Sequence, residues 1–169
     1  TFVDLFTIYQ SYGSLDGISI GFLGDLKYGR TVHSLVKALN HFDVKMHFIS
    51  PNELRLPKEV MEKLDRGKII KETNNLYEVA KDLDFLYATR IQKERFLFQE
   101  EYAKLSANYQ LDSNFLTKAK PTIKIMHPLP RVGELKHELD KSSSALYFKQ
   151  AHNGIPVRMA LLSLLFGYA

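Results

Sequence analysis

The fold is decided by the stretch Ile-Ser-Ile-Gly-Phe-Leu-Gly-Asp-Leu-Lys-Tyr-Gly-Arg-Thr, residues 18–31. Its first six residues form a short apolar run, which is typical of a strand buried on both faces of a parallel sheet. A helical pattern begins directly afterwards, and apolar side chains recur at helical spacing from Val32 to Leu39. A buried strand that turns into an amphipathic helix predicts an α/β fold.

The same alternation continues along the rest of the chain. Further strands are expected at 45–49, 69–70, 84–88 and 123–126, and helices at 2–9, 31–42, 56–64, 76–81, 98–107, 113–119 and from Pro156 onward. Strands that alternate with helices indicate a parallel sheet with helices on both faces. We therefore predict one Rossmann-like, three-layer domain over residues 1–169, with a mostly parallel central sheet.

Composition limits the chemistry that this chain can perform. Cysteine is absent from the 169 residues, so disulfides, thiolate metal sites and a cysteine nucleophile are excluded. His41, His47, His137 and His152 show no ligand spacing, and we expect no metal site. We expect no cofactor either.

Charge and hydropathy argue against two classes of partner. The net charge of +4 comes from lysines that are interleaved with acidic residues, so no nucleic-acid partner is expected. The longest apolar stretch, 159–166, is interrupted by Ser163 and is far shorter than the roughly 20 residues that span a bilayer. No membrane partner is expected, and a cytoplasmic location fits the lack of cysteine.

Three polar segments, 24–31, 89–95 and 127–131, follow predicted strands, and each contains arginine. Open α/β sheets bind ligands just beyond the carboxyl ends of their strands. Because parallel strands bring these ends to one edge, we expect the segments to converge on one crevice. The arginines indicate that its ligand is an anion.

The first segment admits an alternative. Residues 24–31 match the phosphate-binding loop Gly-x-x-x-x-Gly-Lys-[Ser/Thr], except that Arg30 stands in place of the lysine. Asp25 would repel phosphates, and Asp84 precedes its strand, whereas a magnesium-binding aspartate follows one. Both features argue against a nucleotide triphosphatase. A plain strand-to-helix turn explains the two glycines but not the arginine.

The other two segments suggest how an amino acid is held. Arg90 and Gln92 lie at alternate positions, so an extended backbone points both to one side. A guanidinium group binds a carboxylate through two parallel hydrogen bonds, and an amide completes the acceptor set. In the third segment Pro128 and Pro130 restrict their neighbours, so Leu129 is predicted to be extended, with its carbonyl aimed at a ligand N–H. A rigid closing loop is the structural alternative.

Taken together, the segments resemble the signature blocks of aspartate carbamoyltransferase catalytic chains. The matching blocks are Gly-Asp-Leu-Lys-Tyr-Gly-Arg-Thr-Val-His-Ser (24–34), Thr-Arg-Ile-Gln-Lys-Glu-Arg-Phe (89–96) and His-Pro-Leu-Pro-Arg-Val (127–132). The resemblance covers almost the whole chain. Ornithine carbamoyltransferases typically carry His-Cys-Leu-Pro in the third block, whereas Pro128 replaces the cysteine here.

The resemblance implies transfer of a carbamoyl group from carbamoyl phosphate to L-aspartate in pyrimidine synthesis. It implies that Arg30, Arg90 and Gln92 bind the two carboxylates of aspartate. Pro128 and Leu129 would present backbone carbonyls to the reacting nitrogens, with Leu129 and Pro130 as the catalytic positions and a cis bond between them. It also implies a catalytic homotrimer of the full chain, in some members joined by a regulatory chain.

The chain also departs from the family. Neither the Ser-Thr-Arg-Thr-like block nor the His-Pro-Thr-Gln block that binds carbamoyl phosphate in the family occurs in these residues. We therefore interpret the chain as the aspartate-binding domain, inactive alone and dependent on a missing N-terminal domain for carbamoyl phosphate. Gly133 replaces the usual Asp or Asn, and 98–110 corresponds to the family's mobile loop. A non-catalytic anion-binding or assembly module on the same fold is the alternative.

Overall fold

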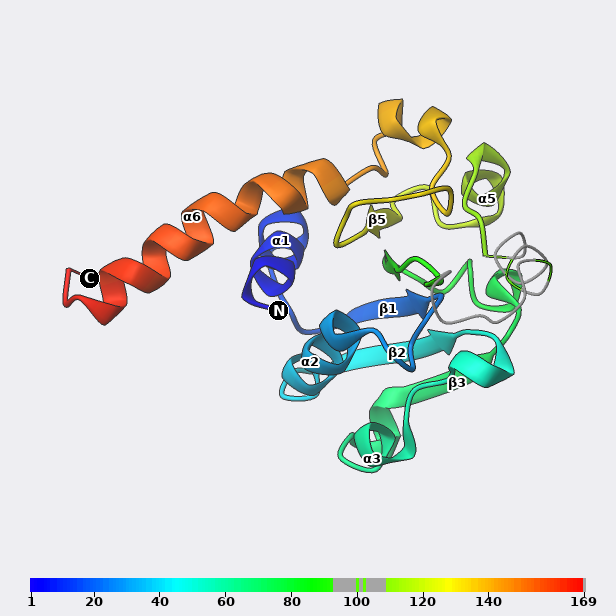
Figure 1. The fold of residues 1–169 in the computed structure, drawn as a ribbon, viewed down its shortest axis with the longest axis horizontal. Coiled ribbons are helices and arrows are strands. Elements are labelled where there is room, and N and C mark those ends of the chain that lie inside the picture. Colours follow the sequence, from blue (N-terminus) through cyan, green and yellow to red (C-terminus); the bar gives the residue numbers. More distant parts are fainter. Residues whose placement is uncertain (93–99, 101, 103–108, 169) are drawn as a thin grey trace.

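A computed structural model of the chain describes residues 1–92, 100, 102 and 109–168. Its centre is a five-stranded sheet in the order β3-β2-β1-β4-β5, in which every neighbouring pair is parallel (Figure 1). The strands are β1 (Ile18–Leu23), β2 (Val44–Ile49), β3 (Ile69–Thr73), β4 (Phe85–Ala88) and β5 (Lys124–Met126). The helices are α1 (Phe2–Tyr12), α2 (Arg30–Leu39), α3 (Lys58–Met61), α5 (Ser113–Lys118) and α6 (Tyr147–Leu165). The predicted α/β fold is confirmed.

Each face of the sheet packs against its own hydrophobic core. Ile20 and Phe22 of β1 face the core shared with α1, α2 and α3. Leu23 of β1 and Leu86 of β4 face the second core, to which α5 contributes Phe115. Successive side chains of a strand point to opposite faces, so a strand between two cores is apolar along its whole length. β1 is accordingly buried at all six positions.

The strand order reverses between β1 and β4, and this reversal positions the site. From β1 the chain continues to β2 and then β3 on one side of β1, and it then returns to form β4 and β5 on the other side. Leu23 pairs with Ala88, and Tyr87 pairs with Met126, so the three strands end at similar heights. Segments 24–31, 89–92 and 127–131 therefore leave the sheet at the same edge, which is where ligands bind in such folds.

The last helix begins earlier than the sequence suggests. We expected it to start at Pro156, but α6 starts at Tyr147 and contains Pro156 inside it. Proline lacks the N–H that would bond the carbonyl four residues earlier. The first half of α6 is nevertheless held against α1, because Gln150 donates to Asp4 Oδ1 at 2.7 Å and Asn153 donates to Thr7 Oγ1 at 2.9 Å. These contacts maintain the helix through the proline.

Three further expectations need correction or fall outside the described residues. The helix predicted at 56–64 is reduced to α3, since the chain after Met61 continues in tighter turns in which N–H groups bond the carbonyl three residues back. The helix predicted at 76–81 is a 3₁₀ turn, Leu76–Glu78, and the edge strand predicted at 69–70 extends to Thr73. The helix predicted at 98–107 lies almost wholly outside the described residues.

Candidate functional site

The loop after β1 is held to the sheet by backbone contacts. Gly24 has a φ of 109°, a conformation open to glycine, and its N–H donates to the carbonyl of Ile49 at the end of β2 (3.0 Å). The imidazole Nε2 of His33 lies 2.8 Å from the carbonyl oxygen of Leu26, so this histidine ties α2 to the loop. Arg30 is the first residue of α2, and its side chain is exposed.

The exit of β4 is fastened to the exit of β1. Thr89 donates both its N–H (2.8 Å) and its hydroxyl (3.0 Å) to the carbonyl oxygen of Leu23. Exposure then alternates along the chain: Arg90 is exposed, Ile91 is buried and Gln92 is half-buried. This alternation is what an extended backbone past the strand requires. Arg90 therefore emerges at the same sheet edge as Arg30, on the neighbouring strand.

The loop after β5 has a more unusual backbone than expected. The Leu129–Pro130 bond is cis, as the family resemblance implies. Leu129 has a φ of 53°, so the prediction that it is extended is wrong. The tendency of a residue before proline to be extended is a local effect, and here the Leu129 N–H is held by a hydrogen bond to Nδ1 of His127 (2.9 Å). Pro128 and Pro130 are exposed, and Leu129 is half-buried.

Glu134 is a site residue that the sequence analysis missed. Its Oε1 lies 2.9 Å from Nε2 of the buried His127, and its carboxylate accepts the N–H groups of Val132 and Gly133. Burial opposes ionisation, but the contact with His127 and the backbone N–H groups outweigh it and lower the pKa of Glu134 to about 2. No sequence pattern distinguishes this glutamate from the solvated ones, because its partner is identified only by the folded loop.

Arg131, the arginine of the third block, is occupied by a structural ion pair. It contacts both carboxylate oxygens of Asp140, one of them at 2.6 Å from Nη2. Tyr147, at the start of α6, donates its hydroxyl to the same carboxylate at 2.6 Å. Hydrogen bonds from Arg131 and then Tyr147 hold the pKa of Asp140 well below its usual range. Arg131 therefore anchors the end of the loop through Asp140, and its guanidinium group is engaged within the protein.

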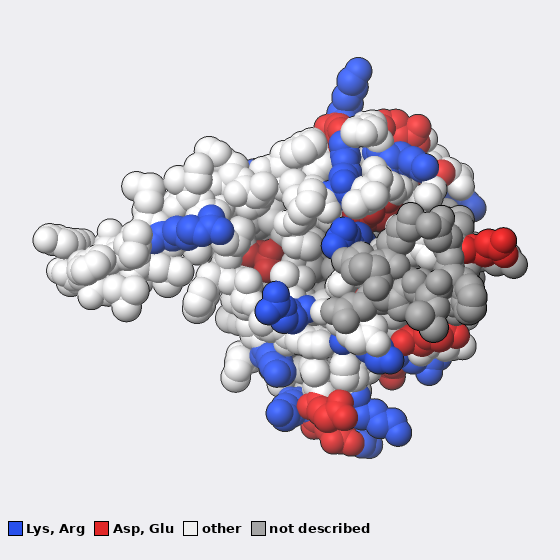
Figure 2. All heavy atoms as spheres, viewed as in Figure 1, with Lys and Arg blue, Asp and Glu red and all other residues white. Residues whose placement is uncertain are grey.

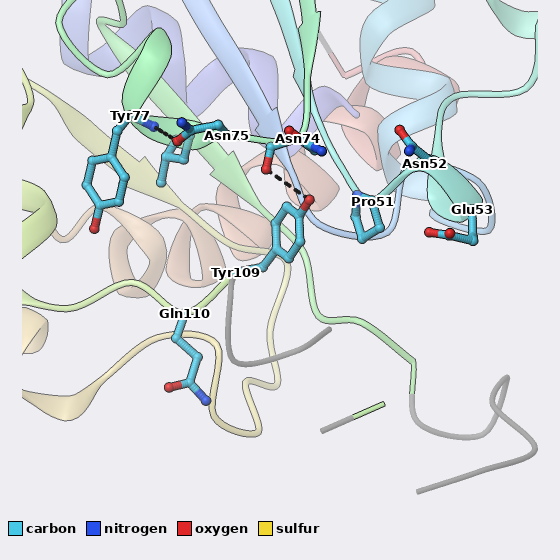
Figure 3. A pocket seen from close by; sticks show the side chains of 9 residues that line it. Pro51, Asn52, Glu53, Asn74, Asn75, Tyr77, Tyr109 and Gln110 are labelled. Carbon is cyan, nitrogen blue, oxygen red and sulfur yellow. Dashed lines mark hydrogen bonds between the residues drawn. The ribbon is translucent and has the colours of Figure 1, made fainter. Parts of the chain in front are cut away.

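Two hollows lie along this edge of the molecule. The smaller, about 220 Å³, lies between the second and third segments and is lined by Thr89, Ile91, Tyr102, Tyr109, Gln110, Val132, Gly133 and Glu134. The larger, about 450 Å³, lies beyond the ends of β2 and β3 and is lined by Pro51, Asn52, Glu53, Asn74, Asn75, Leu76, Tyr77, Tyr109 and Gln110 (Figure 3). No lysine or arginine stands among the described residues that line it. The larger hollow therefore fits the predicted anion poorly, because its described lining includes the carboxylate of Glu53 and no cationic side chain.

Tyr109 separates the two hollows and was not singled out from the sequence. Its hydroxyl donates to the carbonyl oxygen of Asn74 at 3.1 Å, a contact drawn in Figure 3. Burial, with a smaller contribution from Glu53, raises the pKa of Tyr109 to about 12. The phenol therefore stays protonated and fastens the chain at 109–110 to the end of β3.

The family comparison agrees with the fold. Residues 16–165 match the sequence model of the family "Aspartate/ornithine carbamoyltransferase, Asp/Orn binding domain". The catalytic subunit of aspartate carbamoyltransferase from Thermococcus gammatolerans is 54% identical over 168 residues, which cover 99% of this chain and 54% of that protein. The corresponding subunit from Haloquadratum walsbyi is 49% identical over 170 residues, covering 100% of this chain and 56% of the relative.

Solved structures give the same result. The catalytic subunit of M. jannaschii aspartate transcarbamoylase superimposes with a TM-score of 0.91 at 49% identity, over 98% of this chain and 54% of that one. The Trypanosoma cruzi aspartate transcarbamoylase in complex with N-(phosphonacetyl)-L-aspartic acid gives a TM-score of 0.87 at 40% identity, over 95% of this chain and 53% of that one. The chain thus spans about half the length of the relatives it matches.

Proposed function

Because this chain belongs to the aspartate/ornithine carbamoyltransferase family, in which it matches the Asp/Orn binding domain, we propose that it is the aspartate-binding half of an aspartate carbamoyltransferase. The full protein would transfer the carbamoyl group of carbamoyl phosphate to the amine of L-aspartate. The products would be N-carbamoyl-L-aspartate and phosphate, in de novo pyrimidine synthesis. Relatives named aspartate carbamoyltransferase catalytic subunit, matched over almost the whole chain, support this assignment.

The observation that carries this proposal is the adjacency of β1 and β4 at the switch point. Arg30 follows β1 by one loop, and Arg90 follows β4 by one buried residue, so both exposed guanidinium groups belong to one sheet edge. A dicarboxylic amino acid needs two such groups, one for each carboxylate. We assign Arg30, Arg90 and Gln92 to the two carboxylates of aspartate.

Catalysis in this proposal rests on positioning and involves no covalent enzyme intermediate. The neutral amine of aspartate attacks the carbamoyl carbon, a tetrahedral oxyanion forms, and phosphate leaves and takes up the proton that the attacking nitrogen loses. Backbone carbonyls of Pro128 and Leu129 accept hydrogen bonds from the reacting nitrogens, and Leu129 and Pro130 are the catalytic positions. Fixed acceptors of this kind favour the attacking geometry without reorganisation during the reaction.

The rest of the full protein would supply the binding site for carbamoyl phosphate, and the exposed part of α6 is where we propose that it packs. α6 extends away from the sheet, and this end of the molecule carries few charged side chains (Figures 1 and 2). An apolar groove of about 400 Å³ runs along it, lined by Phe2, Phe6, Pro156, Val157, Ala160, Leu161 and Leu164. None of the described helices is long and apolar enough to cross a membrane. The groove is lined by apolar side chains, and an apolar protein surface fits such a lining.

Three further features implied by the family resemblance accompany this proposal. We propose that the full chain forms a catalytic homotrimer in the cytoplasm and that a regulatory chain is a further partner. Aspartate transcarbamoylase from Trypanosoma cruzi has been solved in complex with carbamoyl phosphate, with aspartate and phosphate, and with carbamoyl aspartate and phosphate. Those ligands make carbamoyl phosphate and L-aspartate the first substrates to test.

The experiment is calorimetric binding of N-(phosphonacetyl)-L-aspartate and of succinate to the full-length protein. Arg30→Ala and Arg90→Ala are each expected to weaken binding at least 100-fold, since each removes a charge-assisted contact to one carboxylate. Arg66→Ala is the matched control, because this exposed arginine precedes β3 and therefore lies at the amino-terminal ends of the strands, away from the proposed site. Unchanged binding in both site variants would favour the anion-binding or assembly module. A full-length protein that forms no carbamoyl aspartate would overturn the enzymatic proposal.

A further inference from the structure

His127 is a buried residue of the third block to which the proposed function assigns no role. The ring Nδ1 of His127 accepts the backbone N–H of Leu129 at 2.9 Å, and the backbone N–H of His127 donates to Oε1 of Gln150 at 2.8 Å. A ring nitrogen that accepts a hydrogen bond carries no proton, so the proton of the neutral imidazole is on Nε2. The side chain is 1% exposed, which shields this arrangement from water.

Glu134 favours that tautomer from the other side of the ring. Its Oε1 lies 2.9 Å from Nε2, and no described residue offers Nε2 a well-aligned hydrogen bond. The contact is therefore chiefly electrostatic, between an ionised carboxylate and the N–H side of the ring. The carboxylate itself is fixed by the N–H groups of Val132 and Gly133, so its position does not depend on the histidine.

The backbone that this pair supports adopts a sparsely populated conformation. Leu129 has a φ of 53°, a left-handed value that residues with a Cβ atom adopt only when surrounding contacts impose it. The bond from its N–H to Nδ1 is one such contact. A second support comes from Gln150, which holds the His127 backbone and is itself bonded to Asp4 of α1. The loop is thus fixed from both sides at the residue whose carbonyl is proposed to meet the substrate.

We propose that His127, oriented by Glu134, is a positioning residue that holds the Leu129 backbone in the conformation required for carbamoyl transfer. This inference rests on the function proposed above. Neither side chain is placed in contact with the reacting atoms. The required property of His127 is an unprotonated acceptor at the Nδ1 position, because a proton there would face the Leu129 N–H and break the contact.

The test in the full-length protein compares two amide substitutions. His127→Asn places an acceptor oxygen near the Nδ1 position, whereas His127→Gln places its amide near the Nε2 position. We expect kcat of the His127→Gln protein to fall about 100-fold, because small misplacements of a positioned group have effects of that order. The His127→Asn protein should stay within about tenfold of wild type, and KM for carbamoyl phosphate should change little in either. Equal kcat values for the two variants, or the reverse order, would overturn the proposal.

A spectroscopic test is independent of turnover. In histidine-labelled full-length protein, ¹⁵N spectra should show His127 with an unprotonated Nδ1 and a protonated Nε2. Glu134→Gln, which keeps the shape and removes the charge, should reduce this preference and lower kcat without a large change in KM. A proton on Nδ1 in the wild type would overturn the inference even if the enzyme is active. A correct tautomer in a protein that forms no carbamoyl aspartate would instead refute the proposed function and leave the contact established.

Discussion

Gly24 and Thr89 lie so close together at the switch point that a Cβ atom on Gly24 would stand 2.3 Å from the carbonyl oxygen of Thr89. The Thr89 hydroxyl and N–H both donate to the carbonyl of Leu23, the residue before the glycine. The chain segments that lead to Arg30 and Arg90 are therefore joined through backbone contact. The geometry of the proposed aspartate site depends on the absence of a side chain at position 24.

Gly24→Ala should destabilise the protein and weaken substrate binding together. A positive φ disfavours alanine by about 1–3 kcal/mol, and the contact with Thr89 adds to this. Urea unfolding measures the loss in free energy, and calorimetry with N-(phosphonacetyl)-L-aspartate measures binding. Gly133→Ala is the control, because a Cβ atom there meets no heavy atom within 4 Å, and stability should stay within about 0.5 kcal/mol. Equal stability of the two variants would contradict this account.

Gln150→Leu should lower the free energy of unfolding by about 2–4 kcal/mol. The substitution removes the partner of two buried groups, the N–H of His127 and the carboxylate of Asp4, and unsatisfied buried polar groups are destabilising. Gln110→Leu makes the same chemical change at an exposed position and should have little effect on stability. The prediction fails if the two leucine variants unfold at the same urea concentration.

Asp140→Asn should reduce stability at neutral pH and flatten its acid dependence. Arg131 holds the pKa of the folded Asp140 well below its unfolded value of about 3.9, so the carboxylate stabilises the protein above that pH. This contribution is lost as pH falls below about 4, because the unfolded state then binds the proton more readily. Urea unfolding at pH 7, 5 and 3 should show the gap between wild type and variant narrowing on acidification. A constant gap would contradict the assigned ion pair.

Leu164→Glu should destabilise the full-length protein by at least 2 kcal/mol if the groove on α6 is covered by the rest of the chain. A charge buried without a partner has an effect of this size or larger. Ile70→Glu is the control, since Ile70 is comparably exposed, on edge strand β3. Thermal unfolding of both variants makes the comparison. Equal effects would indicate that α6 is a free surface.

The amino-acid sequence was enough to predict the class of fold and the end of the sheet at which the aspartate site is proposed. Apolar runs such as 18–23 are local features, and alternation with helical patterns requires a parallel sheet between two layers. The three polar segments were predictable for the same reason, because parallel strands must end at one edge. Arg30 and Arg90 follow strands that the fold makes neighbours. Their joint binding of one dicarboxylate stays a prediction.

The tertiary structure alone decided the features that depend on contacts distant in sequence. α6 continues through Pro156 because Gln150 and Asn153 bond to α1, more than 140 residues earlier. The left-handed Leu129 and the orientation of His127 depend on side chains whose partners no local pattern identifies. Local preferences of the backbone amount to about 1 kcal/mol or less for most residues, and to about 3 kcal/mol for a proline inside a helix, so a few buried hydrogen bonds reverse them. The sequence therefore predicts where the chain turns, and only the packed structure defines the conformation it holds there.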